Sequence, residues 1–160
     1  MLEIDRDQAR WLRDFFCGNI DGEHQMTMSV LKACPAEALF FRPEHCQLAF
    51  VELAVRIYAD GLRFLRVAQA HNGTPDEPPE AADLQKPALI DICRDWHHAI
   101  MDGFRDLSDR QLVTDIDFNV ERFPAVFMAD WHVVNMVHHR GMLCSYLEMR
   151  EIDVPRVYLR

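Results

Sequence analysis

The sequence predicts an all-α protein built as an antiparallel four-helix bundle. Apolar residues recur at helical spacing through four long stretches of the chain. Strand signals are scarce, because no Asn-Gly or Asp-Gly dipeptide lies between two alternating apolar runs. With 160 residues, 49% of them apolar, the chain can bury a sizeable core. Neither an internal repeat nor a second domain is evident, so we expect a single domain over residues 1–160.

The first helix is expected from about Asp5 to Ala33. Gly18 and Gly22 can bend it, because glycine costs about 1 kcal/mol inside a helix. Pro35 then ends this helix or begins a short extra turn. Its apolar positions are Trp11, Leu12, Phe15, Phe16, Ile20, Met26, Met28, Val30 and Leu31.

The second helix is expected from about His45 to Ala70, after a linker that begins at Arg42-Pro43. The following stretch, from His71 to Glu80, contains three prolines and a glycine, so we expect an exposed loop. The second helix carries one apolar stripe at helical spacing, made of Phe50, Leu53, Ala54, Ile57, Gly61, Phe64, Leu65 and Ala68.

The third helix is expected from about Lys86 to Leu107, and the fourth from Phe123-Pro124 to about Glu151. Proline suits a first helical position, because its missing N–H would have no partner there. Between Asp130 and Arg140 the fourth helix carries no formal charge and is apolar almost all round. We therefore expect the fourth helix to be the best-buried element and to lie beside the second.

Charge and composition exclude several functions. The chain has 26 acidic and 17 basic residues and a net charge of -9, whereas a nucleic-acid interface needs a basic face. No run approaches the roughly 18 uncharged apolar residues of a membrane span. The start of the chain is acidic and polar, so no targeting segment is visible. We expect a cytoplasmic protein that binds neither nucleic acid nor membrane.

Five cysteines are widely spaced, without a CxxC pair and in odd number. A disulfide framework or a structural zinc ribbon would show a different pattern. We expect five reduced, mostly buried thiols, at Cys17, Cys34, Cys46, Cys93 and Cys144.

Polar residues gather on one face of the fourth helix. His132, Asn135, His139, Met142 and Tyr146 recur at steps of three and four residues. This stripe is either a row of hydrogen-bonded core groups or a functional site. His132 and His139 are about 10 Å apart along the helix, which is too far for one metal ion.

Other histidines are available to a site on neighbouring helices. They are His45, His97 and His98, and His97 could reach inward at the edge of the bundle. Nothing in their spacing distinguishes them from surface histidines.

Two segments resemble the DinB/YfiT-like family, four-helix-bundle proteins described as metalloenzymes and unrelated to the polymerase of similar name. One is Val137-His-His-Arg-Gly-Met-Leu-Cys-Ser-Tyr-Leu with the tail that ends at Val154-Pro155. It is similar to a family pattern of His-x-x-His-His-Arg-Gly-Gln-Leu followed by a Val-Pro tail. The other is Leu48 to Asp60, preceded by Phe40-Phe41-Arg42-Pro43.

The resemblance implies a site in which three histidines hold a divalent metal, zinc or nickel. The corresponding positions here are Arg56, Asn135 and His139, so one histidine remains. Zinc sites use thiolate, imidazole or carboxylate ligands, and a guanidinium offers no lone pair. A guanidinium about 4 Å from a divalent ion would cost about 8 kcal/mol at an effective dielectric of 20. We expect a degenerate site without a metal cofactor, with His139 as its one retained ligand.

Two classes of function follow. The first is a binding or regulatory module whose pocket contains Arg56, His132, Asn135 and His139, donors suited to a small-molecule carboxylate or phosphate. The alternative, implied by the resemblance, is a metal-dependent hydrolase or a thiol-dependent S-transferase or isomerase. There the metal would lower the pKa of a thiol or water.

Self-association is also expected. Phe15 with Phe16 and Phe40 with Phe41 exceed the apolar stripe that one bundle needs, and excess apolar surface is usually buried against a partner. The resemblance also implies a dimer, because family members are often dimeric. We therefore expect a homodimer formed through helix faces.

Overall fold

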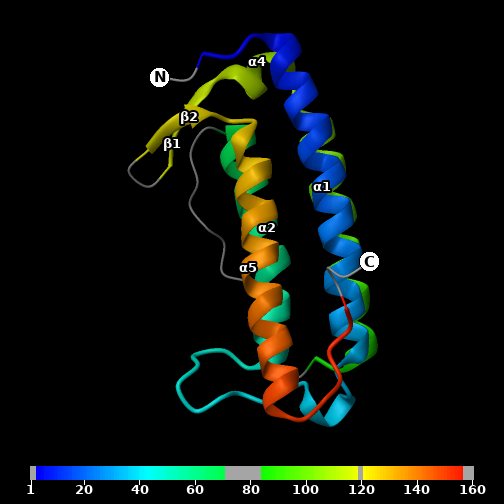
Figure 1. The fold of residues 1–160 in the computed structure, drawn as a ribbon. Helices are drawn as coiled ribbons and strands as arrows, with labels where there is room; N and C mark the ends of the chain where they lie inside the picture. The colour runs from blue at the N-terminus through cyan, green and yellow to red at the C-terminus, as the bar shows by residue number, and fades with distance from the viewer. Residues whose placement is uncertain (1–2, 71–83, 119–120, 157–160) are drawn as a thin grey trace.

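The computed structural model describes residues 3–70, 84–118 and 121–156. Figure 1 shows the long helices packed lengthwise against one another, with a short helix and a β-hairpin at one end. The predicted all-α bundle is confirmed, and the loop expected at His71–Glu80 lies outside the described residues. In chain order the elements are α1 (Arg6–Ala33), a 3-10 turn η1 (Ala36–Ala38), α2 (Phe50–Ala70), α3 (Lys86–Arg105), α4 (Asp109–Val113), β1 (Asp115–Phe118), β2 (Glu121–Pro124) and α5 (Phe127–Met149).

Contacts near the helix ends fix which helices run antiparallel. The Tyr146 hydroxyl, near the end of α5, donates to the Leu48 carbonyl just before α2, at 3.1 Å. Lys86, the first residue of α3, donates to the carbonyl of Lys32 near the end of α1, at 2.7 Å. The antiparallel pairs are therefore α2 with α5 and α1 with α3. Each helix also packs on a member of the other pair, α1 on α5 and α2 on α3.

Helices α2 and α3 run in the same direction. Gly61 lies against Ile100, and Leu65, one turn later, lies against Gly103.

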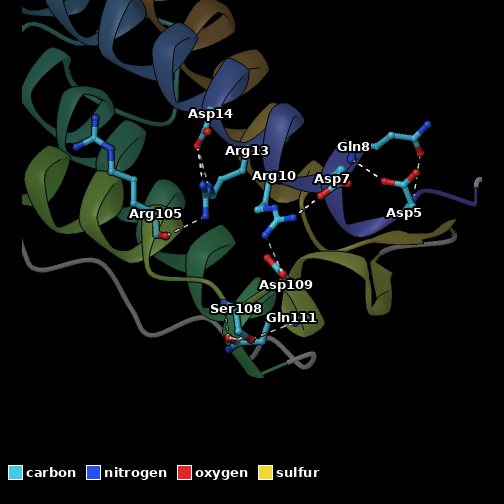
Figure 2. A network of polar contacts seen from close by, with 10 residues as sticks. All are labelled: Asp5, Asp7, Gln8, Arg10, Arg13, Asp14, Arg105, Ser108, Asp109 and Gln111. Carbon is cyan, nitrogen blue, oxygen red and sulfur yellow. Dashed lines mark hydrogen bonds and ion pairs between the residues drawn. The ribbon is translucent and has the colours of Figure 1, made fainter.

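Capping boxes begin α1 and α4 at the hairpin end of the bundle, and Figure 2 shows both. Asp5 accepts from the backbone N–H of Gln8 at 2.8 Å, and the Gln8 side chain accepts from the N–H of Asp5 at 3.0 Å. Ser108 and Gln111 make the same reciprocal pair at the start of α4. These caps satisfy N–H groups that have no partner within the helix.

Two arginines of α1 connect it to the end of α3 and to α4. Arg10 pairs with Asp7 in its own helix and with Asp109 of α4 at 3.3 Å. Arg13 donates to the carbonyl of Arg105 at 3.2 Å (Figure 2). The helix α1 is unbroken from Arg6 to Ala33, so its glycines do not interrupt it.

The expected start of the fourth long helix at Phe123-Pro124 is wrong. Residues Glu121–Pro124 form strand β2, which pairs antiparallel with β1 and places Ile116 opposite Phe123. The alternation of Asp115, Ile116, Asp117 and Phe118 is a strand pattern too short to stand out among helices. The described residues contain this one two-stranded sheet, and it lies outside the bundle.

The second helix begins at Phe50, five residues later than expected. The Glu52 carboxylate accepts from the N–H of Ala49 at 2.6 Å and so caps the helix there. The carbonyls of Phe41 and Leu39 accept from the next two N–H groups, at 3.0 and 2.9 Å. The third helix ends at Arg105, and α4 was not predicted.

The expectation that the last helix is the best buried is also wrong. Trp131 is 36% exposed, Val134 56% and Val137 39%, and more positions are buried in α2 than in α5. Helix α5 packs on α1 and α2 while a third face meets solvent. A stretch of helix without charged residues is therefore not necessarily covered by other helices on all sides.

Phe15 and Phe40 are exposed, whereas Phe16 is buried and Phe41 packs against Tyr146. The expected homodimer stays a prediction.

All five cysteines are free thiols, as expected. Within the described ranges, none of the helices combines the length and the apolar character needed to cross a bilayer.

Arg140 of α5 is the largest of the fully buried side chains, with 1% exposure. Its Nη2 lies 2.5 Å from Oε2 of Glu23 on α1. Its Nη1 donates to the Glu23 carbonyl at 3.1 Å and to the Thr27 hydroxyl at 3.4 Å. The guanidinium thus joins α5 to α1 in the middle of the bundle.

Arg140→Met should lower the free energy of unfolding by about 3–5 kcal/mol, because it leaves the Glu23 carboxylate without its buried partner. Adding Glu23→Leu should restore most of that loss. Urea unfolding followed by circular dichroism measures both. Arg94→Met is the matched control, because Arg94 pairs with Asp91 at the surface and the change should cost at most about 1 kcal/mol. Equal costs for the two single variants would contradict the role of Arg140.

Candidate functional site

The seam between α2 and α5 brings together Arg56, Asn135 and His139, the three positions that the family resemblance singled out. They gather around Asp60. Arg56 Nε lies 3.4 Å from Asp60 Oδ2, and Asn135 Nδ2 donates to the same oxygen at 3.3 Å. His139 lies one turn beyond Asn135 and contacts its backbone carbonyl.

This assembly follows from helix geometry. Arg56 and Asp60 are four residues apart on α2, and Asn135 and His139 are four apart on α5. Such pairs share a helix face. Because α2 and α5 are antiparallel neighbours, the two faces meet side by side.

The hydrogen bond of His139 fixes its tautomer. Its Nδ1 lies 3.0 Å from the backbone oxygen of Asn135, which can only accept, so Nδ1 carries the proton. Burial lowers the pKa of His139, with further lowering by His138 and Arg56 and opposite contributions from the Asn135 bond and Asp60. The ring is therefore neutral at pH 7, and Nε2 is its acceptor.

Two clefts open along this seam and meet at Asp60, His138 and His139. The larger, about 540 Å³, contains Arg56 and mostly polar side chains. The smaller, about 310 Å³, contains Asn135, and its surface is mainly apolar although several polar side chains line it. Besides the shared residues, the larger is lined by His45, Cys46, Gln47, Leu48, Leu53, Arg56, Met142 and Tyr146, and the smaller by Arg63, Phe64, Phe118, Trp131, Val134 and Asn135.

The donor set at the seam does not fit a three-histidine metal site. Arg56 is held by the Asp60 carboxylate, and Asn135 uses its amide nitrogen on the same carboxylate. His139 is the one imidazole at the three positions. Across residues 3–70, 84–118 and 121–156, no group of three or more His, Cys, Asp or Glu side chains is arranged to hold a metal ion.

The sequence did not identify two components of the seam. Asp60 was not among the predicted site residues, although it lies one helical turn after Arg56. Phe118 was missed because its hairpin was missed. Its ring meets Trp131 at 5.4 Å between centroids.

His132 does not belong to this pocket, contrary to expectation. Its side chain is fully buried and packs against Gly61, where a Cβ atom would lie 2.4 Å from His132 Cε1. Neither ring nitrogen has a hydrogen-bond partner among the described residues. Burial lowers the pKa of His132 to about 3, with smaller contributions from His97 and His24. Its place on the inner side of the stripe directs it into the core.

Of the other histidines, His97 is buried and reaches inward, whereas His45 and His98 are exposed. The ring of His97 stacks on His24 with 3.7 Å between centroids, and its Nε2 lies 3.2 Å from Asp21. His24 in turn bonds the Tyr58 hydroxyl at 2.8 Å, and burial lowers the pKa of His24 to about 4. The helices α1, α2 and α3 thus share a polar cluster that the sequence pattern did not reveal.

Solved structures with the same architecture are DinB-like proteins, which confirms the fold expected from the family resemblance. One is the DinB-like protein YjoA from Bacillus subtilis, with a TM-score of 0.72, 17% identity, and coverage of 91% of this chain and 99% of that one. Another, from Bacillus cereus, gives a TM-score of 0.69 and 18% identity over 89% of this chain and 95% of that one. No family model matches the sequence, and no curated protein matches it. At these identities the likeness establishes the fold, and function has to be argued from the residues.

His132→Leu should flatten the acid side of the stability profile. The folded-state pKa of His132 is about 3, below the ordinary 6.5, so the unfolded chain binds more protons between these values. Stability is therefore lost as pH falls below about 6.5, by up to about 1.4 kcal/mol per pH unit for this group. Urea unfolding from pH 7 to pH 4 should show a smaller slope in the variant. The exposed His98→Leu should keep the wild-type slope, and an unchanged slope in His132→Leu would refute the prediction.

Proposed function

We propose that the protein binds a small anionic organic molecule at the α2/α5 seam, with Arg56 as its charged anchor. The observation that carries the proposal is the position of Arg56. Its side chain is 48% exposed in the wall of the larger cleft and contacts Asp60 through Nε. A guanidinium binds carboxylate and phosphate groups through paired N–H donors.

The surrounding residues hold the anchor in place. Asp60 is only 16% exposed and contacts both Arg56 and Asn135, so it connects the two helices and orients the guanidinium. His138 and His139 line the same cleft and add ring nitrogens at its edge. A neutral His139 can accept a hydrogen bond through Nε2 but does not add a charge.

The donor chemistry favours binding without a metal over metal-dependent catalysis. A hydrolase or thiol S-transferase of the kind that the resemblance implies needs a metal to lower the pKa of a water or a thiol. Arg56 and Asn135 cannot supply the imidazoles of such a site, and the Arg56 charge would repel the ion. The same two side chains are suitable ligands for an anion.

Arg56→Gln should weaken binding of butyrate and inorganic phosphate about 10-fold to 100-fold, because a charge-assisted hydrogen bond contributes about 1.5–3 kcal/mol. Isothermal titration calorimetry at low salt measures the affinities. Arg94→Gln, on the outer face of α3, is the control and should bind as the wild type does. Equal affinities of Arg56→Gln and wild type for both probes would exclude Arg56 as the anchor.

Restoring two histidines should create a metal site. The double variant Arg56→His with Asn135→His removes the guanidinium and adds two imidazoles beside His139, so it should bind zinc or nickel tightly. Elemental analysis of untagged protein should give close to one ion per chain in this variant and much less in the parent. About one equivalent in the parent, lost in His139→Ala, would show that the native seam is a metal site.

A further inference from the structure

The smaller cleft is an apolar compartment next to the proposed anion site. Phe64 of α2, Phe118 of β1 and Trp131 of α5 form its walls. The Phe118 ring meets Trp131 edge to face at 5.4 Å and Phe64 at 5.9 Å. Val134 and Trp131 remain partly exposed at its edge. Three elements therefore direct apolar side chains into one concave space.

The polar and apolar ends of the seam are separated by the same length on both helices. Arg56 and Phe64 are eight residues apart on α2, and His139 and Trp131 are eight apart on α5. Eight residues of α-helix span about 12 Å. Because the helices are antiparallel neighbours, Arg56 lies near the level of His139, and Phe64 near that of Trp131.

We infer that one amphipathic molecule occupies both clefts, an organic acid whose apolar group lies about 12 Å from its carboxylate. This inference rests on the proposed function, because it uses Arg56 as the carboxylate anchor. The clefts share Asp60, His138 and His139 as lining residues, so they adjoin in the middle of the seam. A space of about 310 Å³ suits a ring or the end of an alkyl chain.

The occupant is a small molecule, in preference to a second protein chain. The apolar walls form a concave space that is open to solvent, and the cation of Arg63 lies over the Phe118 ring at 5.9 Å at its margin. Single-ring acids with short tails would reach one end of the seam only. Length is therefore the property by which this seam selects its ligand.

A series of phenylalkanoates with the ring at the chain end tests the inference. Phenylacetate, phenylbutanoate, phenylhexanoate, phenyloctanoate and phenyldecanoate differ only in chain length. An extended phenyloctanoate places its ring centre about 12 Å from the carboxylate, given C–C bonds of about 1.5 Å. Affinity measured by calorimetry should rise at least 10-fold from phenylacetate to phenyloctanoate and should not rise further for phenyldecanoate.

Variants separate the two ends of the seam. Trp131→Ala should abolish the dependence on length. Trp11→Ala is the matched control, because Trp11 is also exposed but lies on α1, outside both clefts. Arg56→Gln should weaken every member of the series by a similar factor. Phenyloctanoate should change the tryptophan fluorescence of the wild type and not that of Trp131→Phe.

Equal affinities along the series, or equal effects of Trp131→Ala and Trp11→Ala, would overturn the two-ended ligand while leaving Arg56-dependent anion binding intact. Loss of phenyloctanoate binding in Trp131→Ala, with none in Arg56→Gln, would instead refute the anion anchor. Absence of binding by every probe would refute both. Light scattering on the same samples tests another explanation. If the wild type is a dimer and Trp131→Ala is a monomer, this face is a contact between two copies of the chain and the inference is wrong.

Discussion

The ion pair of Arg140 with Glu23 sets the geometry on which the α2/α5 seam depends. A buried guanidinium is stable only when it is paired and hydrogen-bonded, so α5 must present Arg140 to α1 at the level of Glu23 and Thr27. His139 is the preceding residue and lies about 100° around the helix. With Arg140 directed at α1, His139 is turned towards α2, where it meets the level of Arg56. This contact in the core thus sets the rotation of α5 about its axis. The rotation in turn decides which α5 side chains face the α2/α5 seam.

Two adjacent residues of α2 have different roles, because one lines the α2/α5 seam and the next faces the core. Asp60 faces the clefts and contacts Arg56 and Asn135, while Gly61 leaves the space that His132 fills. The interior therefore holds a neutral imidazole without hydrogen-bond partners among the described residues, close to a hydrogen-bonded surface network. A side chain at Gly61 would displace His132 and separate α2 from α5, so this glycine is required by packing.

Periodicity predicted the four long helices because each spans many turns, and its accuracy declined where elements were short. The hairpin and α4 comprise four or five residues per element, too few to establish a period. The parallel course of α2 and α3 depends on contacts between residues far apart in the sequence, such as Leu65 with Gly103, which no local pattern specifies. At the site, Arg56, Asn135 and His139 were found through the family resemblance, whereas Phe118 required knowledge of the hairpin. His132 was wrongly assigned to the pocket. A stripe of residues at steps of three and four is wide enough for some of its members to face the α2/α5 seam and others the core.

The hairpin that supplies Phe118 forms one wall of the smaller cleft, and this wall is less rigid than those formed by α2 and α5. Two-stranded hairpins are only marginally stable by themselves. This hairpin contacts the core through Ile116, Phe118 and Phe123, whereas α2 and α5 each bury many more side chains there. Segments of low local stability open far more often than the whole molecule unfolds. For the ligand that we propose, local opening of β1 and β2 would be a route for its ring into the apolar end of the seam while the helices stay in place. Local opening would make amide hydrogen exchange faster in the hairpin than in α2. Binding of a ligand at the α2/α5 seam would then slow the exchange of the hairpin amides.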